Sequence, residues 1–573
     1  MRKITLGHQD LLAGLRPALR TAIEGVIGSS RRRGTGIVIA SNLEDDANLL
    51  RELRQRASRD PAPGDLAVVA GAESPSCQCG KERVWYAERP EESEGASAES
   101  LSAFAEWVQA GSVQTVAEDG TTMELDILDR MHGAAIVVMA TAEQQMQVRK
   151  TSSGLQFVPS VSLYPQSLQV TSLNVGSPLS VPPGTGKSII VSVTADGQPM
   201  DSTTVRGYLS SGEYVETTTG SDGICELRIP KSHTAKVGVS VIPQHSYWSL
   251  NKKVEIAGAQ AAIAEFELEA LTPTWIPAFL PRMGDVDLAL AGRGVRVGVI
   301  DTGVSQNHSL LRVVDGASTV IGETDNLDWD DSEGHGTLVA GLIAARGDGI
   351  TTPRGLAPAC ELYAYRICAH GSLRAEEAAL ASAIRQATED GCDIINISFG
   401  GTASMTSVQR AMRDAKARGT VCVVAAGNGF RKHLTFPACY KEALSVSAMG
   451  RLSSYPRTSE FVFSERQDIG HDPEDYVSVF TNIGDQLLLC APGVGIVSCW
   501  LENQMKAAVG TSFAAPLATG LIAKILSNPS ASAILNAPRD GSRADQITLL
   551  ALNSAAGYGF QTIHEGYGLP GHQ

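Results

Sequence analysis

The chain has 573 residues, of which 43% are hydrophobic and 19% are charged, as is typical of soluble globular proteins with more than one domain. Its formal net charge of −15 disfavours nucleic acid and anionic membranes as main partners, because both repel an acidic protein. No apolar run is long enough to cross a bilayer, and the N-terminus lacks the apolar core of a signal peptide, so we predict a cytoplasmic protein without a membrane span.

The cysteines agree with that prediction. Ten cysteines are scattered singly, and Cys392, Cys422 and Cys490 lie inside apolar runs, which is typical of buried, reduced thiols. Cys77 and Cys79 form the only close pair in the sequence. Without a second pair at metal-ligand spacing, we expect no zinc site there.

The first part of the chain alternates between helical and strand-like patterns. Residues 1–30 have apolar side chains at helical spacing, and strand-like runs at 36–40 and 134–140 are each followed by a helix candidate. A further strand is expected at 155–163. This β-α-β order, begun twice, predicts an α+β domain over residues 1–170.

Residues 171–271 have a different pattern and predict a small β-sandwich. Short alternating strands are expected at 188–194, 204–208, 224–229 and 237–242, with turn residues between them.

One glycine-rich stretch of this region, residues 181–188 (VPPGTGKS), superficially resembles a phosphate-binding loop. Val181 stands where that motif has its first glycine, and the stretch runs into a strand rather than a helix. Because phosphate binding needs a helix N-terminus as well as glycines, we expect the approach to a hairpin and no nucleotide cofactor.

Residues 272–573 alternate between short apolar strands and helices. Strands are expected at 295–300, 361–365, 392–398 and 420–426, and helices at 338–345, 373–389 and 407–418. Nearly continuous apolar strands are typical of parallel sheets covered on both faces. The pattern predicts an α/β domain with a doubly wound, mostly parallel sheet, whose loops at the carboxyl ends of the strands handle ligands.

Three polar side chains stand at element ends in this domain. Asp301 directly follows a strand, where it either handles a ligand or caps its Thr-Gly turn. His335 opens a helix between Gly334 and Gly336, two glycines that let another chain approach closely. Asn428 follows another strand, and its side-chain amide is able to donate to an oxyanion.

A fourth candidate, Ser512, stands in Gly510-Thr511-Ser512 just before the apolar run 517–526. A serine in the first turn of a buried helix lies at the positive end of the helix dipole, beside free N–H groups. It is therefore either a nucleophile or a helix cap. Pro516 agrees with a helix start, because proline is tolerated in the first turn, where we place it.

The order Asp301, His335, Asn428, Ser512, within the motifs DTG, GHGT and GTSFAAP, resembles the subtilisin-like serine proteases, or subtilases. The resemblance covers about residues 272–570. It implies that Ser512 attacks the scissile carbonyl carbon, that His335 acts as base and then acid, and that Asp301 orients the imidazole. It also implies that Asn428 and the Ser512 N–H receive the oxyanion.

The same resemblance implies a substrate cleft. Its S1 pocket would have one wall that pairs with the substrate as an added strand, formed by Ser398, Phe399, Gly400 and Gly401. The opposite wall would lie near Gly427 to Gly429.

The N-terminal region, over about residues 35–165, resembles the ferredoxin-like inhibitory propeptide of subtilases. This implies that it acts as an intramolecular inhibitor whose tail lies in the cleft and is cut by Ser512. A β-sandwich between propeptide and catalytic domain is unusual in the family, so a permanent regulatory domain is the alternative.

Some features depart from the compact members of the family. The segment 449–485 is longer than they need and is either a lid, a specificity loop or a surface insertion.

Family members often bind calcium, for which Asp348 is a candidate ligand, although no Asp-x-Asp spacing supports it. We expect no other cofactor. The acidic residues between 325 and 333 are expected to form a solvated loop.

The favoured hypothesis is an endopeptidase that acts on proteins or peptides and stays inactive until its N-terminal region is cleaved or displaced. A binding or scaffold protein with a vestigial subtilase domain is a second hypothesis, against which the complete set of four residues argues. ATP-driven chemistry at Lys187 is a third.

Overall fold

The structure is a computed structural model, and it describes residues 83–88, 112–116, 122–131, 135–140, 144, 148, 158–159, 161–167, 179–182, 186–211, 213–231, 236–256, 261–283, 290–323, 325–466 and 470–571. The helix predicted at 1–30, the strand predicted at 36–40 and the cysteine pair at 77 and 79 lie outside these residues. Residues 84–139 and 151–573 belong to one compact unit. No helix among the described residues is long and apolar enough to span a bilayer.

Five strands of the N-terminal region form one sheet in the order β2-β3-β4-β1-β5. They are β1 (Arg83–Glu88), β2 (Ser112–Val116), β3 (Thr122–Met131), β4 (Ala135–Ala140) and β5 (Val158–Pro159). The strand predicted at 134–140 is present as β4. The single strand predicted at 155–163 is wrong, because β5 pairs with β1 whereas β6 (Ser162–Pro165) pairs with strands of the C-terminal half. The ferredoxin-like character of this region stays a prediction.

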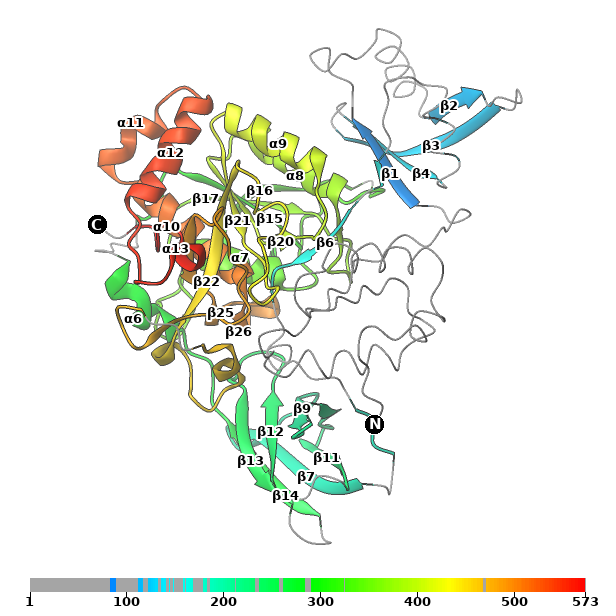
Figure 1. Ribbon diagram of the computed structural model, residues 1–573, viewed down its shortest axis with the longest axis vertical. Coiled ribbons are helices and arrows are strands. Elements are labelled where there is room, and N and C mark those ends of the chain that lie inside the picture. The colour runs from blue at the N-terminus through cyan, green and yellow to red at the C-terminus, as the bar shows by residue number, and fades with distance from the viewer. Residues whose placement is uncertain are drawn as a thin grey trace, which may run out of the picture. The chain divides into compact units, whose positions relative to one another are not determined.

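Residues 186–268, here called the two-sheet segment, form two sheets (Figure 1). Buried side chains of both sheets belong to one hydrophobic core. One sheet has the order β10-β9-β12-β13, and the other has the order β11-β7-β14 with β8 also paired to β7. The strands are β7 (Gly186–Ala195), β8 (Gln198–Pro199), β9 (Thr204–Tyr208), β10 (Tyr214–Thr218), β11 (Ile224–Pro230), β12 (Lys236–Ile242), β13 (Leu250–Glu255) and β14 (Ala262–Leu268). The four predicted strands are present. Lys187 lies on β7 and donates to the carbonyl oxygen of Ile256 at 3.0 Å.

The insertion at 449–485 packs against the two-sheet segment. The N–H of Asn251 donates to the carbonyl oxygen of Thr458 at 2.6 Å. The rings of Trp248 and Phe461 meet edge to face, with centroids 5.9 Å apart. The insertion therefore forms a contact surface for the two-sheet segment. None of the interpretations of the sequence included this role.

Glu460 is buried in the middle of this contact. The Tyr208 hydroxyl donates to Glu460 Oε2 at 2.6 Å, and the Ser240 hydroxyl donates to Oε1. Burial raises the pKa of Glu460 to about 7, although hydrogen bonds from Tyr208 and Asn251 lower it. The carboxyl group therefore changes its protonation near neutral pH.

An eight-stranded sheet forms the centre of the C-terminal half, in the order β16-β17-β15-β19-β21-β22-β23, with β24 also paired to β22. Its strands are β15 (Arg296–Asp301), β16 (Val313–Ser318), β17 (Glu361–Arg366), β19 (Ile394–Ile397), β21 (Val421–Ala425), β22 (Ala443–Arg451), β23 (Asp475–Val477) and β24 (Leu489–Pro492). All paired strands are parallel except β22 with β23. The predicted mostly parallel sheet is confirmed.

Helices cover both faces of this sheet (Figure 1). The helices α7 (His335–Ala344) and α10 (Thr511–Leu526) pack on one face, and α8 (Glu377–Glu389) and α9 (Thr406–Ala417) pack on the other. Side chains of a strand point alternately to the two faces, so Val423 and Val424 belong to different hydrophobic clusters. The doubly wound arrangement is therefore confirmed, with the predicted helices in place.

The remaining named strands and α-helices are shorter or peripheral. They are β18 (Ala375–Glu376), β20 (Phe399–Gly400), β25 (Val494–Cys499), β26 (Met505–Val509), α6 (Trp275–Phe279), α11 (Ser532–Leu535), α12 (Gly541–Asn553) and α13 (Thr562–Glu565).

Candidate active site

Asp301 and His335 meet at the carboxyl end of β15. His335 Nδ1 lies 2.6 Å from Asp301 Oδ1, and the same oxygen accepts the N–H of Thr302 at 2.8 Å. Asp301 is fully buried, and His335 is nearly so. Because the N–H of Thr302 also points at this oxygen, the carboxylate is fixed as an acceptor for the imidazole.

The two glycines beside His335 are required by close packing. Gly334 has a φ of 83°, and a Cβ there would lie 2.5 Å from the ring of Trp500. A Cβ at Gly336 would lie 2.0 Å from the carbonyl oxygen of Gly303. The predicted close approach of other chain segments to the start of α7 is confirmed.

The second ring nitrogen of His335, Nε2, is buried and has no hydrogen-bond partner among the described residues. The imidazole lies between the rings of Phe399 and Phe513, at centroid distances of 5.9 and 5.5 Å. Neither aromatic ring offers Nε2 a hydrogen-bond partner, so this nitrogen is available as an acceptor.

Ser512 is the second residue of α10 and is fully buried. Its hydroxyl donates to the carbonyl oxygen of Ser398 at 2.9 Å. Pro516 lies inside α10, so its predicted place in the first turn is wrong. Proline has no N–H for the carbonyl oxygen four residues earlier, that of Ser512, and the Ser398 hydroxyl donates to this oxygen instead, at 2.9 Å.

Asn428 is oriented by the residue before Ser512. Its Oδ1 accepts the backbone N–H and the hydroxyl of Thr511, both at 3.0 Å. Its Nδ2 is therefore turned away from Thr511, and it is buried without a hydrogen-bond partner among the described residues. A Cβ on Gly510 would lie 3.2 Å from this nitrogen and 2.7 Å from the carbonyl oxygen of Gln166.

The strand β6 lies along these residues as the middle strand of a three-stranded antiparallel sheet, between β18 and β20. Leu163 is fully buried in the same cluster as residues of the C-terminal half. Just after β6, the N–H of Gln166 donates to the Ser398 carbonyl oxygen at 2.7 Å, and the N–H of Ser512 donates to the Gln166 carbonyl oxygen at 2.7 Å. The chain thus places one of its own carbonyl groups beside Ser512.

The residues predicted as cleft walls have different partners. Phe399 and Gly400 pair with Pro165 and Tyr164 of β6, as expected for an added strand. The Gln166 side chain donates to the Gly400 carbonyl oxygen at 3.1 Å. A Cβ on Gly401 would lie 3.2 Å from the Ser162 carbonyl oxygen. Gly427 donates its N–H to the Thr511 hydroxyl at 3.1 Å and so supports the start of α10.

Sequence reasoning missed Asp331, which it placed in a solvated acidic loop. Asp331 is buried, and burial raises the pKa of its carboxyl group. It accepts the Thr302 hydroxyl at 2.9 Å, the N–H of Gly334 at 2.9 Å and the Thr337 hydroxyl at 2.6 Å. It therefore joins the loop after Asp301 to the start of α7, and nothing in the acidic pattern distinguishes it from its neighbours.

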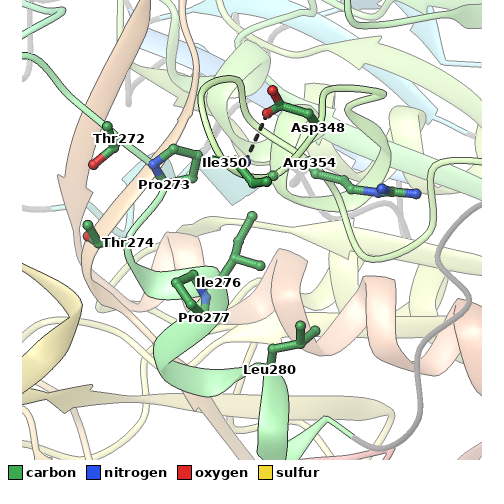
Figure 2. A pocket seen from close by; sticks show the side chains of 10 residues that line it. Thr272, Pro273, Thr274, Ile276, Pro277, Leu280, Asp348, Ile350 and Arg354 are labelled. Atoms are coloured by element: carbon green, nitrogen blue, oxygen red, sulfur yellow. Dashed lines mark hydrogen bonds between the residues drawn. The ribbon is translucent and has the colours of Figure 1, made fainter.

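Asp348, the candidate calcium ligand, lines a separate cavity of about 620 Å³, together with Ile276 and Arg354. Figure 2 shows its carboxylate turned to the N–H of Ile350. Further bonds come from the N–H and hydroxyl groups of Thr351 and Thr352, and they hold the pKa of Asp348 far below its usual range. These donors reach both carboxylate oxygens, and the role of Asp348 as a calcium ligand stays a prediction. The described residues contain no cluster of His, Cys, Asp and Glu side chains suited to a metal ion.

Known proteins match the C-terminal half of this chain. The model of the Subtilase family matches residues 292–569, which contain Asp301, His335, Asn428 and Ser512. Subtilisin DY of Bacillus licheniformis is 37% identical over 247 residues, or 42% of this chain and 80% of the relative. Alkaline elastase YaB of Bacillus sp. (strain YaB) is 35% identical over 42% of this chain and 56% of the relative. A thermostable alkaline protease of Halalkalibacterium halodurans is 31% identical over 46% of this chain and 65% of the relative.

Proposed function

The chain belongs to the subtilase family and is a subtilisin-like serine endopeptidase, and we propose that Ser512 is its nucleophile, His335 its general base and Asp301 the group that orients His335. Asn428 and the backbone N–H of Ser512 stabilise the oxyanion in this proposal. Protein or peptide chains are the substrates.

One observation supports the further proposal that the protein cleaves its own chain. The carbonyl oxygen of Gln166 accepts the N–H of Ser512 at 2.7 Å, which is the contact that an oxyanion would make. On this basis the first substrate is the chain itself, cut between Gln166 and Ser167. Residues up to Gln166 act as an intramolecular inhibitor, because β6 fills the cleft.

In the proposed reaction, the Ser512 hydroxyl turns from the Ser398 carbonyl oxygen to His335 Nε2 and attacks the carbonyl carbon of Gln166. His335 takes the hydroxyl proton, and the negative charge that develops on the Gln166 oxygen is met by Ser512 N–H and Asn428 Nδ2. His335 then gives its proton to the nitrogen of Ser167, which leaves. Water, activated by the same imidazole, hydrolyses the acyl-enzyme and frees Ser512.

Such a cut leaves the two-sheet segment attached to the catalytic domain. It follows Ser167 in the sequence, so it stays in the processed chain, whereas the sheet of β1 to β5 precedes the cut. This supports a permanent role for the two-sheet segment and an inhibitory role for the region before it.

The test compares the purified wild-type chain with Ser512→Ala by intact mass and N-terminal sequencing. We expect a wild-type fragment that begins at Ser167 and an uncut variant. A matched control is Ser309→Ala, an exposed serine, which should be cut like the wild type. Cleavage of Ser512→Ala at the same bond would contradict the assignment of the nucleophile. A wild-type fragment that begins at a residue other than Ser167 would contradict cleavage after Gln166.

A further inference from the structure

A second cavity, of about 430 Å³, opens beside the candidate active site. His335 and Phe513 line it from the catalytic domain, and Ile242 and His245 line it from the two-sheet segment. All of these residues belong to the same compact unit. The two-sheet segment thus supplies a wall of the space next to His335.

Ser167 also lines this cavity, and it is the first residue after the proposed cleavage site. The strand β6 and Gln166 occupy the cleft on the other side of that bond. A chain that passes through the site therefore enters this cavity with the residues that follow the scissile bond, on the leaving-group side.

The cavity has apolar walls and one cation. Ile242, Phe461 and Phe513 supply apolar surface, and Lys506 Nζ lies 3.9 Å from the ring centre of Trp500. Burial lowers the pKa of Lys506 to about 8, so the ammonium group is still mostly protonated at neutral pH.

Lys506 makes no ion pair with any carboxylate among the residues that the structure describes. The cavity has one acidic lining residue, Glu333, and its Oε1 accepts the Ser332 hydroxyl at 3.1 Å. The only close charge partner of this partly buried ammonium group is an aromatic face. Its interaction with an incoming anion is therefore favourable, because little water competes for the ammonium group.

We propose that this cavity binds the residues that follow the scissile bond of a substrate, and that Lys506 selects a carboxylate there. The carboxylate comes from an Asp or Glu side chain or from the C-terminus of a short peptide. The inference rests on the proposed function, and it makes the two-sheet segment part of the substrate site.

The test uses quenched fluorescent peptides with Leu-Tyr-Pro-Gln before the scissile bond, copied from residues 163–166. One Glu, or one Gln as its neutral match, is placed in turn at each of the three following positions, in amidated peptides and in peptides with a free C-terminus. A Leu-Tyr-Pro-Gln anilide, which has no residue after the bond, reports hydrolysis alone.

For the purified wild-type protein we expect kcat/KM to favour Glu over Gln by about tenfold at one position, equivalent to one well-placed ion pair. Lys506→Met should bring that ratio to about one. Lys253→Met, an exposed lysine of the two-sheet segment outside the cavity, should keep the wild-type ratio. A preference for peptides with a free C-terminus over their amidated matches, equal for Glu and Gln, identifies the chain end as the carboxylate.

Two results would overturn the inference while the proposed function stands. They are equal kcat/KM both for Glu and Gln peptides and for free and amidated peptides at every position, and a preference for either carboxylate that survives Lys506→Met. Loss of all hydrolysis, including that of the anilide, would instead contradict the proposed function, and the inference with it.

Discussion

The hydroxyl of Ser398 donates to the carbonyl oxygen of Ser512, the oxygen that Pro516 deprives of its helical donor. Asn396 Nδ2 in turn donates to the Ser398 hydroxyl at 3.0 Å, and Thr519 donates to Asn396 Oδ1 at 3.0 Å. This buried chain of hydrogen bonds fixes the start of α10 and therefore the place of the proposed nucleophile.

Ser398→Ala should lower stability by about 1 to 3 kcal/mol, because it leaves the Ser512 carbonyl oxygen and the Asn396 amide without partners in the core. The measurement is thermal unfolding in the Ser512→Ala parent, which removes the proposed self-cleavage. Ser309→Ala is the control, since this serine is exposed, and should leave the unfolding temperature as it was. Equal unfolding temperatures for both variants would contradict the importance of the buried network.

Asn428→Asp should lower kcat by about 10² to 10³ with little change in KM. The aspartate keeps an acceptor for the N–H and hydroxyl of Thr511 but replaces the amide donor with a negative charge. A small peptide substrate gives both constants. A loss of less than about tenfold would show that Asn428 does not meet the oxyanion.

Leu163→Asp should slow the appearance of an N-terminus at Ser167 by at least about tenfold, because a charged side chain would have to enter the core with β6. Tyr164→Asp is the matched control, since Tyr164 is next in the strand but 53% exposed, and it should be processed nearly as fast as the wild type. Quantitative gels over time supply the rates. Equal slowing in both variants would mean that the docking of β6 does not limit the cut.

Glu460 should make the contact of the two-sheet segment sensitive to pH. Its folded pKa of about 7 lies above the ordinary glutamate value of 4.5, so protonation favours the folded state. The stabilisation is complete below pH 4.5, falls as the pH rises through about 7, and amounts to roughly 3 kcal/mol in total.

Glu460→Gln carries no such charge and should therefore unfold at a higher temperature than its Ser512→Ala parent at about pH 8, with the difference shrinking toward about pH 5. Glu255→Gln is a control, as this carboxylate pairs with Lys236 at the surface of the two-sheet segment. A pH-independent difference between Glu460→Gln and its parent would show that Glu460 does not titrate in this range.

Local patterns were enough to predict the sheet of the C-terminal half and its helices, whereas the meeting of Asp301 with His335 was implied by the resemblance to subtilases. Apolar strands buried on both faces leave an unbroken signal, and the glycines around His335 mark a close approach that the structure contains. Ser512 and Asn428 were found in the same way, because each stands at the end of an element whose type the sequence reveals.

Other features depend on partners distant in sequence and could not be predicted. Nothing near Gln166 indicates that its carbonyl oxygen meets Ser512, and Glu460 resembles any surface carboxylate until Tyr208 is placed against it. The prediction that Pro516 lies in the first turn of its helix was wrong for a related reason. Its missing N–H is compensated by Ser398, more than a hundred residues earlier in the chain.

The strand β6 belongs to the same polypeptide as β18 and β20, the two strands between which it lies. In the proposed cleavage, enzyme and first substrate therefore never have to find each other, and maturation is a first-order process. Its half-life should be the same in a dilute and in a concentrated solution, so that a cell would finish the step equally fast with few copies of the chain as with many.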